Sequence, residues 1–105
     1  MNLEQVQKSI HDNPGLLLYF WGENCNVCHA LQPKLFEAFE NRFPKIERVA
    51  VNVTEHPDIA AHFGVFSIPT GIVFLDGREF ERFSRNLSIP ALIQKLERPY
   101  TLFFD

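Results

Sequence analysis

The segment Leu16–His29, LLLYFWGENCNVCH, predicts the fold of this chain. It begins with six apolar or aromatic residues, and a continuous apolar run of this kind is typical of a strand that is buried on both faces. A polar turn follows, and the residues from Cys28 to Phe43 have helical spacing. Cys25 and Cys28 are therefore expected at the joint between a buried strand and the first turn of a helix.

The two cysteines of this turn are expected to differ in exposure. Cys25 should be the more exposed sulfur, and Cys28 should be the more buried one. Unpaired backbone N–H groups and the positive end of the helix dipole favour a thiolate at a helix start. Such settings lower a cysteine pKa from about 8.5 to roughly 3.5–7.5. Because the thiolate is the nucleophile, the motif predicts thiol–disulfide exchange.

Two other interpretations of the cysteine pair stay open. A structural disulfide between Cys25 and Cys28 would close a very short loop and would stabilise the chain little. A zinc site needs a second pair of ligands. The chain has no other cysteine, and the other histidines are scattered, so only a zinc or iron–sulfur site shared between two chains would fit.

Cys25-Asn26-Val27-Cys28-His29 also matches C-x-x-C-H, the attachment pattern of c-type haem. Residues 1–15 contain no unbroken apolar core of the kind found in an export signal. The only methionine is Met1, so the usual second axial ligand is missing. These features argue against haem.

Length and composition predict one domain over residues 1–105. Hydrophobic residues make up 46% of the chain and include eleven phenylalanines, so an aromatic core is expected. The net charge is −3 and the cations are dispersed, which argues against a nucleic-acid or membrane partner. No apolar run approaches the roughly 18 residues of a membrane span. Two cysteines in one motif suit a reducing compartment, so a cytoplasmic location is expected.

Hydrophobic spacing and turn residues predict four helices and four strands, in the order α-β-α-β-α-β-β-α. This order implies a mixed sheet with helices on both faces. The expected helices are Asn2–Asp12, Cys28–Phe43, Asp58–Phe63 and a last helix that Ser88 caps and that includes Leu92, Ile93 and Leu96. The expected strands are Leu16–Trp21, Ile46–Val53, Gly71–Leu75 and Glu79–Ser84, and Asp76-Gly77 joins the last two. In the second helix Pro33 is expected to bend the axis, and the residues expected to face inward are Ala30, Leu31, Leu35, Phe39 and Phe43.

The chain resembles the thioredoxin family. The resemblance covers about residues 16–96, and the matching pieces are Phe20-Trp21 before the cysteines, Pro33 after them, Asn52-Val53-Thr54 leading to Pro57, Gly64-Val65, Ile68-Pro69-Thr70 and Asp76-Gly77. It implies an α/β thioredoxin-like fold in which a mixed four-stranded sheet is flanked by helices. Since the chain opens directly in a helix, the family's usual first strand is expected to be missing, which leaves one sheet edge less covered.

The resemblance also implies a function. The chain would be a thiol–disulfide oxidoreductase that exchanges protein disulfides, with Cys25 as nucleophile and Cys28 as resolving cysteine. An external reductase would regenerate the dithiol, and no cofactor besides this disulfide and no metal would be needed. The proline at Pro69 would have a cis peptide bond and face the cysteines. The implied substrate-binding residues are Trp21, Asn24, Ser67, Ile68 and Pro69.

Several positions depart from the family pattern. Tyr19 falls where the family has a buried acid that relays the proton of the second cysteine, and Ala50 falls at a usual lysine. His29, four residues after Cys25 on the same helical face, can stabilise the thiolate or shuttle a proton. The departures also support an alternative function, a non-catalytic binding or scaffold protein with weak redox activity.

The C-terminal segment Arg98–Asp105, RPYTLFFD, is not common to the family. Its four large apolar residues make full exposure to solvent unfavourable. We expect the segment to cover the gap of the missing strand or to form a homodimer contact.

Overall fold

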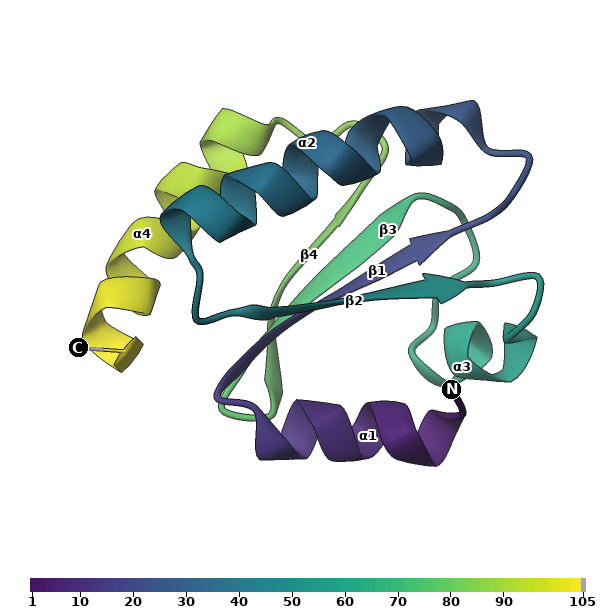
Figure 1. Ribbon diagram of the computed structural model, residues 1–105, viewed down its shortest axis with the longest axis horizontal. Helices are drawn as coiled ribbons and strands as arrows, with labels where there is room; N and C mark the ends of the chain where they lie inside the picture. Colours follow the sequence, from purple (N-terminus) through teal and green to yellow (C-terminus); the bar gives the residue numbers. More distant parts are fainter. Residues whose placement is uncertain (105) are drawn as a thin grey trace.

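A four-stranded sheet with two helices on each face forms the body of the protein (Figure 1). The computed structural model describes residues 1–104. In chain order the elements are α1 (Leu3–Asp12), β1 (Gly15–Trp21), α2 (Asn26–Arg42), β2 (Glu47–Asn52), α3 (Pro57–His62), β3 (Thr70–Leu75), β4 (Arg78–Ser84) and α4 (Ile89–Phe104). The predicted element order is therefore confirmed, and most boundaries shift by only one or two residues.

Strand β1 is central to the sheet, whose strand order is β2-β1-β3-β4. It runs parallel to β2 and antiparallel to β3, and β3 pairs antiparallel with β4. Residues 16–20 of β1 have no exposed surface. A strand with neighbours on both sides and helices on both faces has no polar side, which explains the unbroken apolar run in the sequence.

Alternate residues of β1 face two separate clusters. Leu16, Leu18 and Phe20 pack on the side of α1 and α3, whereas Leu17 and Tyr19 pack on the side of α2 and α4. This alternation is the period of a strand. Each face of the sheet therefore has its own core, and α2 is held against the sheet through its buried residues Leu35 and Phe39 and through the C-cap residue Phe43. Ala30, which the helical spacing placed in the same inward stripe, is exposed, and the buried residue of this first turn is Cys28.

The first helix begins at a capping box formed by Asn2 and Gln5. The Asn2 side chain accepts a hydrogen bond from the Gln5 N–H at 2.8 Å, and the Gln5 side chain accepts one from the Asn2 N–H at 3.1 Å. These contacts satisfy donors that a helix start would otherwise leave unpaired. Helix α1 covers one face of the sheet with Val6 and Ile10, both buried.

The β3–β4 hairpin turns at Asp76-Gly77, where both residues have positive φ, 55° and 75°. Such a turn matches the twist of the strands that it joins. Within the hairpin Phe74 pairs with Glu79 and Val73 pairs with Glu81, so Phe80 is an extra residue in β4. After this bulge, the side chains of β4 point to the opposite faces of the sheet from those that strict alternation would give.

The C-terminal segment is helical and continues α4 through Pro99. Tyr100 and Phe104 pack in the α2-side cluster, where the Phe43 and Tyr100 rings lie 5.0 Å apart. The Tyr100 hydroxyl accepts a hydrogen bond from the Lys45 N–H at 3.1 Å. The segment thus covers the chain just before β2, while the described strand pairings of β2 involve β1 alone. Asp105, the last residue of the predicted tail, lies outside the described residues.

Prediction one concerns Gly71 on β3, which lies opposite Phe83 on β4. A Cβ added to Gly71 would overlap the Phe83 ring. We expect Gly71→Ala to lower the free energy of unfolding by about 1–3 kcal/mol, because the ring must leave its position. The measurement is denaturant unfolding of all four members of a double-mutant cycle with Phe83→Ala. In the Phe83→Ala background, Gly71→Ala should lower the free energy of unfolding by less than half as much as it does in the wild type. An equal loss in both backgrounds would contradict the explanation.

Candidate active site

The two cysteines lie where β1 passes into α2 and are joined by a disulfide, with their Cα atoms 5.2 Å apart. Cys25 is the N-cap residue of α2, and its sulfur accepts a hydrogen bond from the Cys28 backbone N–H at 3.1 Å. Cys25 is half-buried, whereas Cys28 has no exposed surface. The predicted difference in exposure is therefore confirmed, and the sulfur that solvent can reach is that of Cys25.

The hydrogen bond to Cys25 explains how the fold can activate this sulfur. In the reduced protein a thiolate at this position would face the N–H group of Cys28 and the positive end of the dipole of α2. A hydrogen bond to the charged form lowers a pKa. Since α2 has no acidic residue in its first turn, no neighbouring carboxylate in that turn opposes the effect.

Tyr19 lies beneath the cysteines and is fully buried. Its hydroxyl donates a hydrogen bond to the Cys28 carbonyl oxygen at 2.9 Å. Burial raises the pKa of Tyr19 to about 12, so the phenol stays protonated at neutral pH. A neutral phenol does not take up a proton as a buried carboxylate would, so Tyr19 does not replace the acid that the family has at this position. Its hydroxyl instead holds the backbone at Cys28.

His29 lies in the first turn of α2 and contacts the loop that precedes the cysteines. Its Nε2 is 2.8 Å from the Glu23 carbonyl oxygen, an acceptor, so this nitrogen donates the hydrogen bond. The imidazole also meets the Trp21 ring edge-on, with ring centroids 5.7 Å apart. These contacts tie the loop and Trp21 to α2.

The peptide bond between Ile68 and Pro69 is cis, as the resemblance implies. The Thr70 hydroxyl donates a hydrogen bond to the Ser67 carbonyl oxygen at 2.7 Å, which closes the loop around the proline. Ile68 approaches the cysteine loop so closely that a Cβ on Gly22 would meet its Cδ1 at 2.7 Å. The proline loop and the cysteine loop are therefore in direct contact.

A groove of about 570 Å³ opens beside Cys25 between these two loops. The sequence predicts Asn24 and Ile68 as part of the substrate site, and both line the groove together with Cys25. The other three predicted residues, Trp21, Ser67 and Pro69, are not part of its lining. Trp21 lines a hollow next to β2, and Ser67 lines a hollow next to β4. The full lining is Gly22, Glu23, Asn24, Cys25, Asn26, Val27, Thr54, Ile68 and Arg85.

The sequence analysis did not single out Arg85, which lines the groove, or Phe66, which lines the hollow beside Ser67. Arg85 follows the last residue of β4, and the hairpin pairs Ser84 with Thr70, which follows Pro69. Pairing the residues of β3 and β4 outward from the Asp76-Gly77 turn would have shown that Arg85 lies beside the proline loop. Phe66 is 88% exposed and lines the hollow beside Ser67. Its sequence neighbours gave no signal of this exposure.

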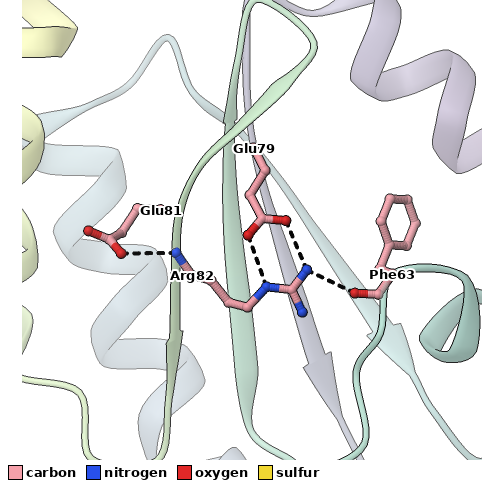
Figure 2. A network of polar contacts seen from close by, with 4 residues as sticks. All are labelled: Phe63, Glu79, Glu81 and Arg82. Atoms are coloured by element: carbon pink, nitrogen blue, oxygen red, sulfur yellow. Dashed lines mark hydrogen bonds and ion pairs between the residues drawn. The ribbon is translucent and has the colours of Figure 1, made fainter.

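Arg82 connects β4 to the segment that leads into the proline loop, as Figure 2 shows. Its Nε and Nη2 donate to the two carboxylate oxygens of Glu79 at 3.0 and 2.8 Å, and Nη2 also donates to the Phe63 carbonyl oxygen at 2.8 Å. The hydrogen bond with Arg82 lowers the pKa of Glu79 and raises that of Arg82.

The bulge at Phe80 makes the Arg82 contact possible. Without it, Glu79 and Arg82 would project from opposite faces of β4. With it, they lie opposite Phe74 and Ile72, two residues of the same cluster. Since Phe63 directly precedes Gly64, where the proline loop begins, the contact fixes one end of that loop.

The sequence model of the thioredoxin family matches residues 1–98. The chain belongs to the thioredoxin family. The thioredoxin-like protein YdfQ of Bacillus subtilis is 32% identical over 102 residues, covering 97% of this chain and 90% of that protein. A thioredoxin of Alicyclobacillus acidocaldarius is 36% identical over 72 residues, 69% of each chain.

Solved structures give the same result. A mutant thioredoxin of Halobacterium salinarum has a TM-score of 0.79 at 26% identity, covering 93% of this chain and 84% of that one. Oxidised mitochondrial thioredoxin 3 of Saccharomyces cerevisiae has a TM-score of 0.80 at 26% identity, covering 92% and 90%. The α/β thioredoxin fold expected from the resemblance is thus confirmed.

This thioredoxin-family protein is a thiol–disulfide oxidoreductase with a cysteine pair close enough to form its redox disulfide. The family acts on protein disulfides and is reduced by a reductase. Among residues 1–104, no cluster of three or more His, Cys, Asp or Glu side chains could hold a metal ion. Within the same residues, no helix has the length and apolar composition of a membrane span.

Prediction two tests the buried hydroxyl of Tyr19. Tyr19→Phe should lower the free energy of unfolding by about 0.5–1.5 kcal/mol, because the Cys28 carbonyl loses a donor. Folding raises the pKa of Tyr19 from 10.0 to about 12, so it favours the neutral phenol. The stabilisation that the Tyr19 phenol adds to the folded state should be complete below pH 10 and should be lost as the pH rises toward 12.

The measurement is urea unfolding of both proteins across this pH range. The stability gap between the wild type and Tyr19→Phe should stay constant at neutral pH and shrink in alkali. A gap that instead widens with rising pH would contradict the assignment of Tyr19 as a protonated donor.

Proposed function

We propose that Cys25 is the nucleophile of this oxidoreductase and that Cys28 is the resolving cysteine. The Cys25 thiolate attacks one sulfur of a substrate disulfide, which forms a mixed disulfide and releases the other substrate sulfur as a thiolate. The Cys28 thiolate then attacks Cys25, which forms the Cys25–Cys28 disulfide and releases the second substrate sulfur. Two electrons pass from the protein to the substrate, and solvent protonates the released thiolates.

One observation carries this assignment. Cys25 is half-buried at the start of α2 and its sulfur accepts a hydrogen bond from the Cys28 N–H, while Cys28 is fully buried. An incoming disulfide can therefore reach Cys25 first, and Cys28 can react only with the sulfur next to it. The opposite order would require a substrate to enter the core.

The substrate-binding residues of the proposal are Trp21, Asn24, Ser67, Ile68 and Pro69. Asn24 and Ile68 line the groove beside Cys25, which supports their direct contact with a substrate. The turn closed at Ser67 and the cis bond before Pro69 support a role for the backbone of Ile68 in holding a substrate at the same groove. Trp21 supports the cysteine loop from behind through His29.

His29 acts on the Cys25 thiolate through its charge in this proposal. Its Nε2 is held by the Glu23 carbonyl, and protonation of the ring at Nδ1 leaves that hydrogen bond intact. A protonated His29 one turn from Cys25 adds positive charge near the sulfur without a rearrangement.

The protein is a single thioredoxin-like domain over residues 1–105, works in the cytoplasm, needs no cofactor beyond its disulfide, and binds neither nucleic acid nor membrane. An external reductase returns it to the dithiol. Leu102 and Phe103 on the outer side of α4 are 71% and 41% exposed, and they support a homodimer contact through this helix.

Prediction three is that the dithiol protein reduces insulin disulfides under dithiothreitol and that Cys25→Ser abolishes this activity. Cys28→Ser should retain the first step and lose the second. The measurement is insulin turnover together with intact-mass analysis of the product. When pre-reduced Cys28→Ser is mixed with insulin after dithiothreitol has been removed, the mass should show a stable protein–substrate mixed disulfide at Cys25.

Two outcomes would contradict the roles assigned to the cysteines. A mixed disulfide that accumulates on Cys28 in the Cys25→Ser protein would reverse the order of attack. Absence of turnover by the intact dithiol protein, under both a chemical reductant and a thioredoxin reductase, would favour the non-catalytic binding protein instead.

A further inference from the structure

We propose that Arg85 makes this protein selective for disulfide substrates that carry an acidic residue beside the reacting cysteine. The inference rests on the proposed function, since it assigns a substrate class to the same groove. Arg85 lines that groove together with Cys25 and Ile68. Arg85 therefore lies on the surface that a bound polypeptide would cross.

The position of Arg85 follows from the β3–β4 hairpin. Strand β3 begins at Thr70, directly after Pro69, and β4 ends at Ser84, which pairs with Thr70. The residue after Ser84 must therefore emerge beside the proline loop. Arg85 lies in the turn directly after Ser84, so the pairing of Ser84 with Thr70 sets where the chain leaves the sheet beside the groove.

The guanidinium of Arg85 is available for a ligand. Within residues 1–104, no carboxylate lies in ion-pair distance of Arg85, whereas Arg82 on β4 is paired with Glu79. The other charged residue that lines the groove is Glu23, on the cysteine loop. The groove is thus positive on its β4 side and negative on its α2 side.

This charge pattern suits an acidic residue on the β4 side of a bound substrate. A guanidinium presents parallel N–H groups that match a carboxylate and stays charged at every working pH. An exposed ion pair of this kind changes kcat/KM by about two- to fivefold. A basic residue at the same place would meet Arg85 as a like charge and would be disfavoured.

The experiment uses three disulfide peptides that are identical except for Glu, Gln or Lys next to the reacting cysteine. For the wild type, kcat/KM should fall in the order Glu, Gln, Lys, with the Glu and Lys peptides differing by about fivefold or more, since attraction and repulsion combine. In Arg85→Gln the three values should converge, and in Arg85→Glu the order should invert. Raising the salt concentration should compress the wild-type differences.

Arg78→Gln is the matched control. Arg78 is an exposed arginine at the hairpin end of the same strand, opposite Leu75 and far along β4 from Ser84. Arg78→Gln removes one positive charge from the protein, as Arg85→Gln does, but leaves the charges that line the groove unchanged. The order of the three peptides should be unchanged in this variant.

The outcomes separate this inference from the proposed function. If the wild type reduces none of the peptides, the proposed function itself fails. If the wild type reduces all three and Arg85→Gln leaves their ratios unchanged, the function stands and the role of Arg85 is overturned. If Arg85→Gln slows all three equally and also slows the reaction of Cys25 with neutral iodoacetamide, Arg85 acts on the nucleophile, which equally overturns substrate selection.

Discussion

The hydrogen bond from the Cys28 N–H to the Cys25 sulfur is the contact on which the chemistry of this protein depends. It exists because Cys25 is the N-cap residue of α2, and α2 starts at this point because β1 ends at Trp21 and the chain must leave the sheet. The capping position is usually taken by a small oxygen-bearing side chain. A sulfur in this position receives the same stabilisation, and as a thiolate it becomes a nucleophile. The Cys25 sulfur thus both caps α2 and serves as the attacking atom of the site.

The rest of the fold holds a second loop against that sulfur. The buried strand β1 pairs with β3, and β3 begins directly after the cis proline, so the sheet itself brings Pro69 next to the end of β1. At the other end of this loop, Arg82 donates a hydrogen bond to the Phe63 carbonyl oxygen, and the bulge in β4 puts Arg82 on the face of the sheet where it can do so. The cysteine loop is tied in the same manner by His29. Both walls of the groove are therefore anchored to regular elements, which favours a defined geometry for the attacking sulfur.

Much of this architecture could be predicted from the sequence because single physical signals carry it. Burial on both faces requires an apolar run at Leu16–Trp21, and a hairpin with two positive φ values favours Asp76-Gly77. The rest depends on contacts between distant residues. The bulge at Phe80 leaves no mark in the spacing of β4, so the pairing of Glu79 with Arg82 could not be foreseen. The helix α4 continues through Pro99 because burial of Tyr100 and Phe104 outweighs the local cost of a proline.

The pKa of Cys25 in the reduced protein tests the central claim most directly. It can be measured as the pH dependence of the rate at which iodoacetamide alkylates Cys25 in Cys28→Ser, a variant that retains the backbone N–H at position 28. A capping sulfur at the start of α2 predicts a midpoint below about 7.5. A midpoint at or above about 8.5, the value of a free cysteine, would show that the helix start does not activate this sulfur and would contradict the account.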